Sequence, residues 1–146
     1  MHIRRAKKED LSRIAEILVY NNRVNYFPIF GSEEYSFKEL QVLPLAEEYE
    51  KRLPACLVYD DGILRGFIET AGAEVKKMYT DVFFQGRGVG AALLEYAVRE
   101  RGARFLWALE KNSGAIRFYE KQGFFPSGDR ILEEGTAEYL IRLERK

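Results

Sequence analysis

Residues 75–101 read VKKMYTDVFFQGRGVGAALLEYAVRER, and this stretch decides the fold. Its first six residues favour a short strand, and residues 88–101 return to the spacing of an amphipathic helix. Three alternating glycines, Gly86, Gly88 and Gly90, join these two elements. The stretch therefore predicts a strand, a glycine-rich bend and a helix that starts at once.

The rest of the chain alternates strands and helices around this stretch. Before it we expect a strand at residues 2–5, a helix from Lys8 and an aromatic loop at 21–36. A helical stretch at 33–53, which Pro44 kinks or splits, and a β-hairpin at 56–70 should follow. After it we expect a strand at 104–109, a helix at 113–121 and two closing strands, the last at 137–143. This order predicts a single α+β domain over residues 1–146 with one central sheet.

Composition and charge exclude several classes of function. The 146 residues include 23 basic and 23 acidic ones, so no net charge draws the chain to nucleic acid or to anionic lipid. Because Cys56 is the only cysteine and His2 the only histidine, one chain can form neither a disulfide framework, a zinc cluster nor a Ser-His-Asp triad. No apolar run is long enough to span a membrane. We expect a cytoplasmic protein without a metal, a nucleic-acid partner or a membrane partner.

The glycine-rich bend has the features of a phosphate-binding site. Glycine allows positive φ and a close backbone approach, which leaves several N–H groups pointing outward at the positive end of the helix dipole. A P-loop would need Gly-Lys-Ser/Thr, but Ala91 follows Gly90. A dinucleotide fingerprint would follow the first strand of a βαβ unit, whereas three consecutive strands precede this bend. The alternative is that the glycines only make a tight turn.

Two motifs together resemble those of a known family. Gln85-x-x-Gly88-x-Gly90 is similar to the acyl-CoA pyrophosphate motif of the GNAT superfamily of N-acetyltransferases. The run from Asn112 through Ala115, Phe118, Tyr119 and Gly123 to Phe124 resembles the family's second motif, at the expected distance. The resemblance covers nearly the whole chain. It implies the GNAT fold, with a mixed, mostly antiparallel sheet of about seven strands, about four flanking helices and splayed middle strands.

The resemblance also implies acetyl-CoA as the acyl donor, bound where the strand ending at Thr80 splays from the strand ending at Leu109. The residues that would hold it are Met78, Tyr79, Thr80, Gln85, Gly86, Arg87, Gly88, Val89, Gly90, Ala91, Asn112 and Tyr119. Some of these residues have a plainer interpretation. Asn112 could cap the following helix, Tyr119 could be a core aromatic and Arg87 a surface charge. Trp107, in an apolar strand, is expected to be a core residue.

Acetyl transfer to an amine needs a base, an oxyanion site and a proton for the departing thiolate. Tyr119 could supply the proton, since a phenol and a thiol have comparable pKa values. Without a suitable histidine, the base is a carboxylate or a water held by one. Glu74 lies eleven residues before Gln85, the spacing of the strand glutamate in the histone-acetylating branch of the family, and Glu69 is the second candidate. Backbone N–H groups of residues 78–80 could bind the oxyanion.

The acceptor pocket in this superfamily is usually built between the first two helices. We therefore expect Tyr26, Phe27, Phe30 and Tyr35 to line it, unless they form a small aromatic core, and we expect direct attack by a small-molecule amine in a ternary complex. Trp107 stands where ribosomal-protein alanine acetylases carry a glutamate, which disfavours protein N-termini. A protein or peptide acetyltransferase and a non-catalytic acyl-CoA sensor are the alternatives. The sequence leaves monomer and homodimer equally open.

Overall fold

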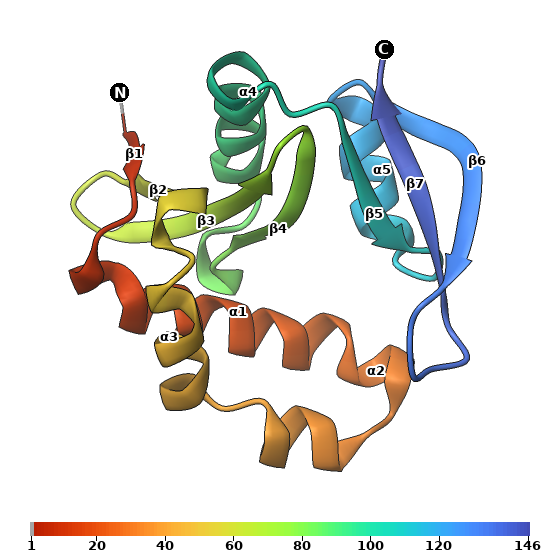
Figure 1. Ribbon diagram of the computed structural model, residues 1–146, viewed down its shortest axis with the longest axis horizontal. Helices are drawn as coiled ribbons and strands as arrows, with labels where there is room; N and C mark the ends of the chain where they lie inside the picture. Colours follow the sequence, from red (N-terminus) through yellow and green to blue (C-terminus); the bar gives the residue numbers. More distant parts are fainter. Residues whose placement is uncertain (1) are drawn as a thin grey trace.

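A computed structural model describes residues 2–146 as one seven-stranded sheet with helices on both faces (Figure 1). The strand order is β1-β2-β3-β4-β5-β7-β6, and every neighbouring pair is antiparallel except β4 and β5. The strands are β1 (Ile3–Arg5), β2 (Cys56–Asp60), β3 (Leu64–Ala71), β4 (Glu74–Thr80), β5 (Phe105–Leu109), β6 (Phe124–Leu132) and β7 (Tyr139–Arg145). The helices are α1 (Leu11–Asn25), α2 (Phe27–Phe30), α3 (Val42–Glu50), α4 (Val89–Arg101) and α5 (Ser113–Lys121). The predicted α+β fold with a mostly antiparallel sheet is confirmed.

The region between the first two predicted helices differs from the expectation. The segment expected as an aromatic loop is largely helical, because α1 continues to Asn25 and α2 follows after Tyr26. The Phe30 N–H donates to the Tyr26 carbonyl at 2.8 Å, and Gly31 ends the helix with a φ of +69°. The turn chemistry of Pro28 and Gly31 suggested a loop, but proline is tolerated in the first turn of a helix.

Pro44 does not kink a helix, contrary to the expectation. The chain leaves the helical conformation earlier, at Leu40 and Gln41, and α3 then begins at Val42. Pro44 therefore lies in the first turn of α3, where its missing N–H would have no partner within the helix. The predicted division into two short helical pieces is confirmed, but the break lies before the proline.

Two apolar layers enclose the sheet. Alternation along β2 and β3 places Val58 and Phe67 in the layer with α1 and α3, and Leu57 and Ile68 in the layer with α4 and α5. In the part of the chain that the structure describes, no helix is both long and apolar enough to cross a membrane.

The middle of the sheet is splayed. β4 and β5 pair only at Glu74 with Phe105 and Val75 with Leu106. Beyond these two pairs the strands separate, although β4 stays paired with β3 as far as Thr80, and β5 stays paired with β7 as far as Leu109. The splayed middle strands predicted from the motifs are therefore present, and the facing edges of β4 and β5 lack a strand partner.

Gly66 is the position in β3 where α4 approaches the sheet most closely. A Cβ atom there would lie 2.8 Å from the Tyr79 carbonyl oxygen and 3.0 Å from Cγ1 of Val89. We predict that Gly66→Ala lowers the free energy of unfolding by about 1–3 kcal/mol, because backbone and a β-branched side chain must both move. Urea denaturation measures the change.

The matched control is Gly114→Ala in α5, where the nearest atom to a new Cβ is Asn112 Oδ1 at 4.0 Å. Alanine there should be neutral or stabilising by up to about 1 kcal/mol. Equal effects of the two substitutions would contradict the close packing of α4 on β3.

Candidate functional site

A cavity of about 1140 Å³ opens where β4 and β5 separate. Its walls come from five parts of the chain: β4, β5, the α1–α2 segment, α5, and the loop between β6 and β7. In Figure 1 that loop approaches α2 from across the sheet. The lining residues used below are Asn22, Tyr26, Phe30, Tyr35, Glu74, Lys77, Met78, Tyr79, Trp107, Tyr119 and Glu133.

The glycine-rich bend is open and leads from the end of β4 into α4. Gly86 and Gly88 have φ values of +79° and +83°, and no atom beyond the adjoining residues lies within 4 Å of the place that a Cβ would occupy at either position. The first helical amide to bond back is that of Ala92, which donates to the Gly88 carbonyl at 3.0 Å. The N–H groups of Val89, Gly90 and Ala91 therefore have no partner within the helix and can bind an anion.

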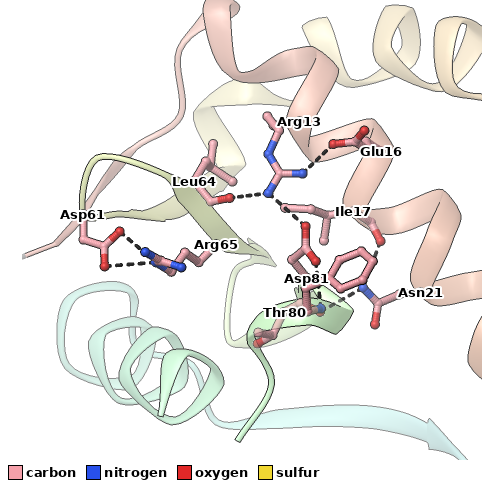
Figure 2. Close-up of polar contacts among 10 residues, drawn as sticks. Arg13, Glu16, Ile17, Asn21, Asp61, Leu64, Arg65, Thr80 and Asp81 are labelled. Carbon is pink, nitrogen blue, oxygen red and sulfur yellow. Dashed lines mark hydrogen bonds and ion pairs between the residues drawn. The ribbon is translucent and has the colours of Figure 1, made fainter. Parts of the chain in front are cut away.

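Side chains of α1 fix the end of β4 just before the bend (Figure 2). Arg13 donates to Asp81 Oδ2 at 2.9 Å and to the Leu64 carbonyl at 2.6 Å. Asn21 donates from Nδ2 to the Thr80 carbonyl at 2.9 Å. Asp81 in turn accepts from the backbone N–H of Phe83 at 2.9 Å. These contacts hold the start of the bend at a fixed position against α1.

Three tyrosines meet at the cavity. Tyr119, on α5, makes no side-chain hydrogen bond to another residue among 2–146, and burial together with Tyr26 raises the pKa of its hydroxyl. Tyr79 is 8% exposed; burial and the Tyr26 hydroxyl raise its pKa. Burial also raises the pKa of Tyr26, although the Tyr79 hydroxyl partly opposes this. All three phenols are therefore protonated at neutral pH.

The two carboxylates predicted as bases lie in different surroundings. Glu74 lines the cavity, half-buried, with Lys76 Nζ 3.7 Å from its Oε1. Glu69 is buried outside the cavity lining, where Tyr49 donates to it at 2.8 Å and Arg52 at 2.7 and 2.8 Å. With both oxygens engaged, Glu69 acts as a structural ion-pair partner, and its position does not fit a base.

The remaining residues expected at the coenzyme lie on the bend or beside it. Gln85 donates to Asn21 Oδ1 at 3.4 Å, and the exposed Arg87 guanidinium lies 5.6 Å from the centre of the Phe84 ring. Asn112 caps α5 by accepting from the Ala115 N–H at 3.2 Å, and it does not line the cavity. The observed contact of Asn112 is therefore the helix cap given above as its plainer interpretation.

Of the aromatic residues expected at the acceptor, Tyr26, Phe30 and Tyr35 line the cavity. Phe27 does not, because its ring packs edge-on against Phe37 with the centroids 5.2 Å apart. Trp107, expected in the core, is only half-buried and faces the cavity, since the splay removes the strand that would cover it.

Sequence reasoning missed several polar groups of the cavity, among them Asn22, Lys77 and Glu133. Glu133 belongs to the loop between β6 and β7, and it lies close enough to raise the pKa values of Tyr26 and Lys77. No motif marks these positions. The alternation of β4, which places Lys77 on the same side as Tyr79, was the one available signal.

Cys56 lies apart from the cavity. Its thiol is fully buried, burial raises its pKa to about 12, and it does not line the cavity. A thiol in this state is a poor nucleophile.

The family model for the acetyltransferase (GNAT) domain matches residues 52–126, about half of the chain, from the second strand past the glycine-rich bend to the start of β6. The chain belongs to the GNAT family. It is thus an acyltransferase by family, as its two motifs predicted.

Several relatives of this GNAT domain are known. An uncharacterized N-acetyltransferase of Methanocaldococcus jannaschii is 42% identical over 57 residues, which make up 36% of this chain and 25% of that protein. The peptidyl-lysine N-acetyltransferase YjaB of Salmonella typhimurium is 23% identical over 97% of this chain and 94% of its own. The chain thus spans a quarter of one relative and nearly all of the other.

Solved structures have the same fold. Apo YjaB of Escherichia coli superposes with a TM-score of 0.76 at 24% identity, covering 97% of this chain and 95% of that one. The PaiA N-acetyltransferase of Thermoplasma acidophilum, solved in complex with coenzyme A, gives 0.67 at 24% identity, covering 97% of each chain.

The structural role of Glu69 is open to a direct test. Glu69→Ala leaves the buried Tyr49 hydroxyl without its acceptor, so the free energy of unfolding should fall by about 1–3 kcal/mol in thermal or urea denaturation. Glu74→Ala is the control. It removes only the half-exposed ion pair with Lys76 and should lower the free energy of unfolding by less than about 1 kcal/mol. A Glu69→Ala protein as stable as the parent would argue against this role.

Proposed function

We propose that this chain is an N-acetyltransferase that moves the acetyl group of acetyl-CoA to the amine of a small molecule by direct attack in a ternary complex. The observation that carries the proposal is the loss of pairing between β4 and β5 beyond Val75 and Leu106. This splay leaves an edge of β4 free and opens a cavity along Met78 and Tyr79, and the glycine-rich bend follows β4 a few residues later.

The donor would lie along this free edge. Amides from Gly86 to Ala91 would hold the pyrophosphate, because the bend is open and the first turn of α4 leaves its N–H groups unpaired. The pantetheine arm would then pair with the edge of β4 as an added strand does. Gly90 lies close to Phe118, because a Cβ there would be 3.3 Å from Cζ of that ring, so a larger residue would need the ring to shift slightly.

Tyr119 would be the general acid. Tyr119 lines the cavity, and its hydroxyl has no hydrogen-bond acceptor among residues 2–146 and keeps its proton because burial raises its pKa. A neutral phenol in this position can donate to the departing thiolate of coenzyme A. Backbone N–H groups of Met78 to Thr80, at the free edge of β4, would stabilise the oxyanion.

Glu133 is the carboxylate that we propose as the base. It lines the cavity and makes no ion pair with a residue of the described chain, and its negative charge raises the pKa of Tyr26. Glu74 remains the second candidate, although Lys76 lies beside it. Glu69 is not proposed, since Arg52 and Tyr49 occupy its oxygens.

A small acceptor is supported by the walls of the cavity. Tyr26 and Phe30 bound it on the helical side, and the loop of residues 133–138 bounds it on the other. A lysine within a protein, the acceptor named for the relative YjaB, is the alternative. It would need to enter between these two walls.

The pyrophosphate site is tested at Gly88. We predict that Gly88→Asp weakens coenzyme A binding by about tenfold or more relative to Gly88→Asn, because both side chains strain the positive φ equally but only aspartate repels the diphosphate. Isothermal titration calorimetry measures both affinities. Equal affinities of the two variants would place the diphosphate elsewhere.

The catalytic roles are tested by free-thiol release from acetyl-CoA with a panel of amines. Tyr119→Phe and Glu133→Gln should each lower kcat by roughly a hundredfold or more, the usual contribution of general acid–base catalysis. Tyr20→Phe, at a half-exposed ring, is the control. Tight coenzyme A binding with no thiol release from any amine would instead favour the non-catalytic acyl-CoA sensor.

A further inference from the structure

Lys77 and Glu133 face the same cavity without an ion-pair partner, as do Glu39 and Glu134. Lys77 comes from β4 and Glu133 from the loop between β6 and β7. Other lysines near the cavity have partners: Lys76 lies 3.7 Å from Glu74, and Lys111 lies 3.1 Å from Glu138. Among residues 2–146, neither Lys77 nor Glu133 has an oppositely charged atom within 4 Å. They nevertheless lie close enough for Glu133 to act on the pKa of Lys77.

Lys77 lacks a partner because its neighbour is already engaged. Its cross-strand neighbour in β3 is Glu69, whose carboxylate is held by Arg52 and Tyr49. Lys77 is exposed in the open cavity. Partial desolvation of its ammonium group lowers its pKa, and the negative charges of Glu69 and Glu133 partly oppose this change. An anion in the cavity would therefore meet a cation that has no ion-pair partner within 4 Å among residues 2–146.

Asn22 adds an independent sign of a missing ligand. It lies on α1 one turn before Tyr26, lines the cavity and is 7% exposed. Its Oδ1 is the one buried side-chain polar atom without a hydrogen-bond partner in the described part of the chain. Buried amides are almost always paired in native proteins, and a polar ligand in the cavity would supply the partner once the Asn22 amide turns toward it.

We propose that the acceptor is a free amino acid whose carboxylate is bound by Lys77 and whose ammonium group faces Glu133, with Asn22 hydrogen-bonded to its polar end. This inference rests on the proposed function and names its substrate class. A zwitterion fits because the cavity offers one lysine without an ion pair, Lys77, and unpaired carboxylates apart from it, Glu133 among them. The aromatic side chains of Tyr26, Phe30 and Trp107 leave an apolar space for the amino acid's own side chain.

The transfer balances with these groups. Glu133 takes one proton from the ammonium group, and the resulting amine attacks the thioester carbonyl. A C–N bond forms, the C–S bond breaks and Tyr119 protonates the thiolate. The second proton of the nitrogen restores the Tyr119 hydroxyl and Glu133 releases the first to solvent, so that the products are the N-acetyl amino acid, coenzyme A and one proton. A diamine or a lysine peptide is the competing acceptor, because Glu39 and Glu134 also line the cavity and could bind a second ammonium group.

Binding can be measured without turnover, because Trp107 is the only tryptophan and lines the cavity. Its fluorescence is followed while the coenzyme A complex is titrated with L-leucine, with 3-methylbutylamine, which lacks only the carboxylate, and with cadaverine. We expect L-leucine to bind about tenfold or more tightly than either amine, as one charge-assisted contact allows. Equal affinities, or tighter binding of cadaverine, overturn the proposal.

Substitutions of Lys77 test whether its charge causes the preference for L-leucine. Lys77→Met should reduce the ratio of the L-leucine and 3-methylbutylamine affinities to near one, while Lys77→Arg should keep most of it. Lys51→Met removes the same charge from an exposed lysine outside the cavity lining and should keep the full ratio. A Lys77→Met protein that keeps the preference for L-leucine overturns the assignment of Lys77.

Thiol release from acetyl-CoA distinguishes a failure of the carboxylate site at Lys77 from a failure of the proposed acetyltransferase function. Turnover of 3-methylbutylamine with a kcat/KM equal to that of L-leucine overturns the carboxylate site but leaves the acetyltransferase standing. Lys77-dependent binding of L-leucine with no thiol release from any amine overturns the enzymatic function but supports the amino-acid site. A higher kcat/KM for L-leucine that Lys77→Met abolishes through KM supports both.

Discussion

The separation of β4 and β5 is the constraint on which the rest of the site depends. Each strand keeps one fully paired neighbour, β3 for β4 and β7 for β5, so the sheet stays intact while its centre opens. The two pairs at Val75–Leu106 and Glu74–Phe105 set the point of divergence. From there the end of β4 is held by α1, through Arg13 to Asp81 and Asn21 to Thr80, so that the glycine-rich bend begins at a fixed position.

The two faces of the sheet contribute different chemistry to one cavity. The face covered by α4 and α5 brings the open bend and the protonated phenol of Tyr119. The face covered by α1 brings Asn22, Tyr26 and, through β4, Lys77. Under the proposed function, donor and acceptor would meet where the strands part. Cys56 is buried away from this meeting point, so the cavity offers no cysteine nucleophile.

Local signals predicted most of the fold. The helix over 89–101 ends where Gly102 takes a left-handed conformation, and Asn112 caps the next helix through a bond of its own side chain. The prediction was wrong between residues 21 and 30, where turn residues suggested a loop. Contacts across the structure override that preference, since Arg23 donates to the carbonyls of Ser36 and Leu40 and ties the following segment back onto α1.

By itself, the sequence determined the order of the elements, the glycine-rich bend and the helix that carries Tyr119, because these depend on residues near one another in the chain. The tertiary structure alone decided which charged groups reach the cavity. Glu69 and Lys77 are neighbours across β3 and β4, yet the first is neutralised by Arg52 and the second is left free. Glu133 enters from a loop more than fifty residues along the chain from Lys77. Spacing within a strand fixes the face of a side chain, but its partners depend on strand order and register, which no local pattern contains.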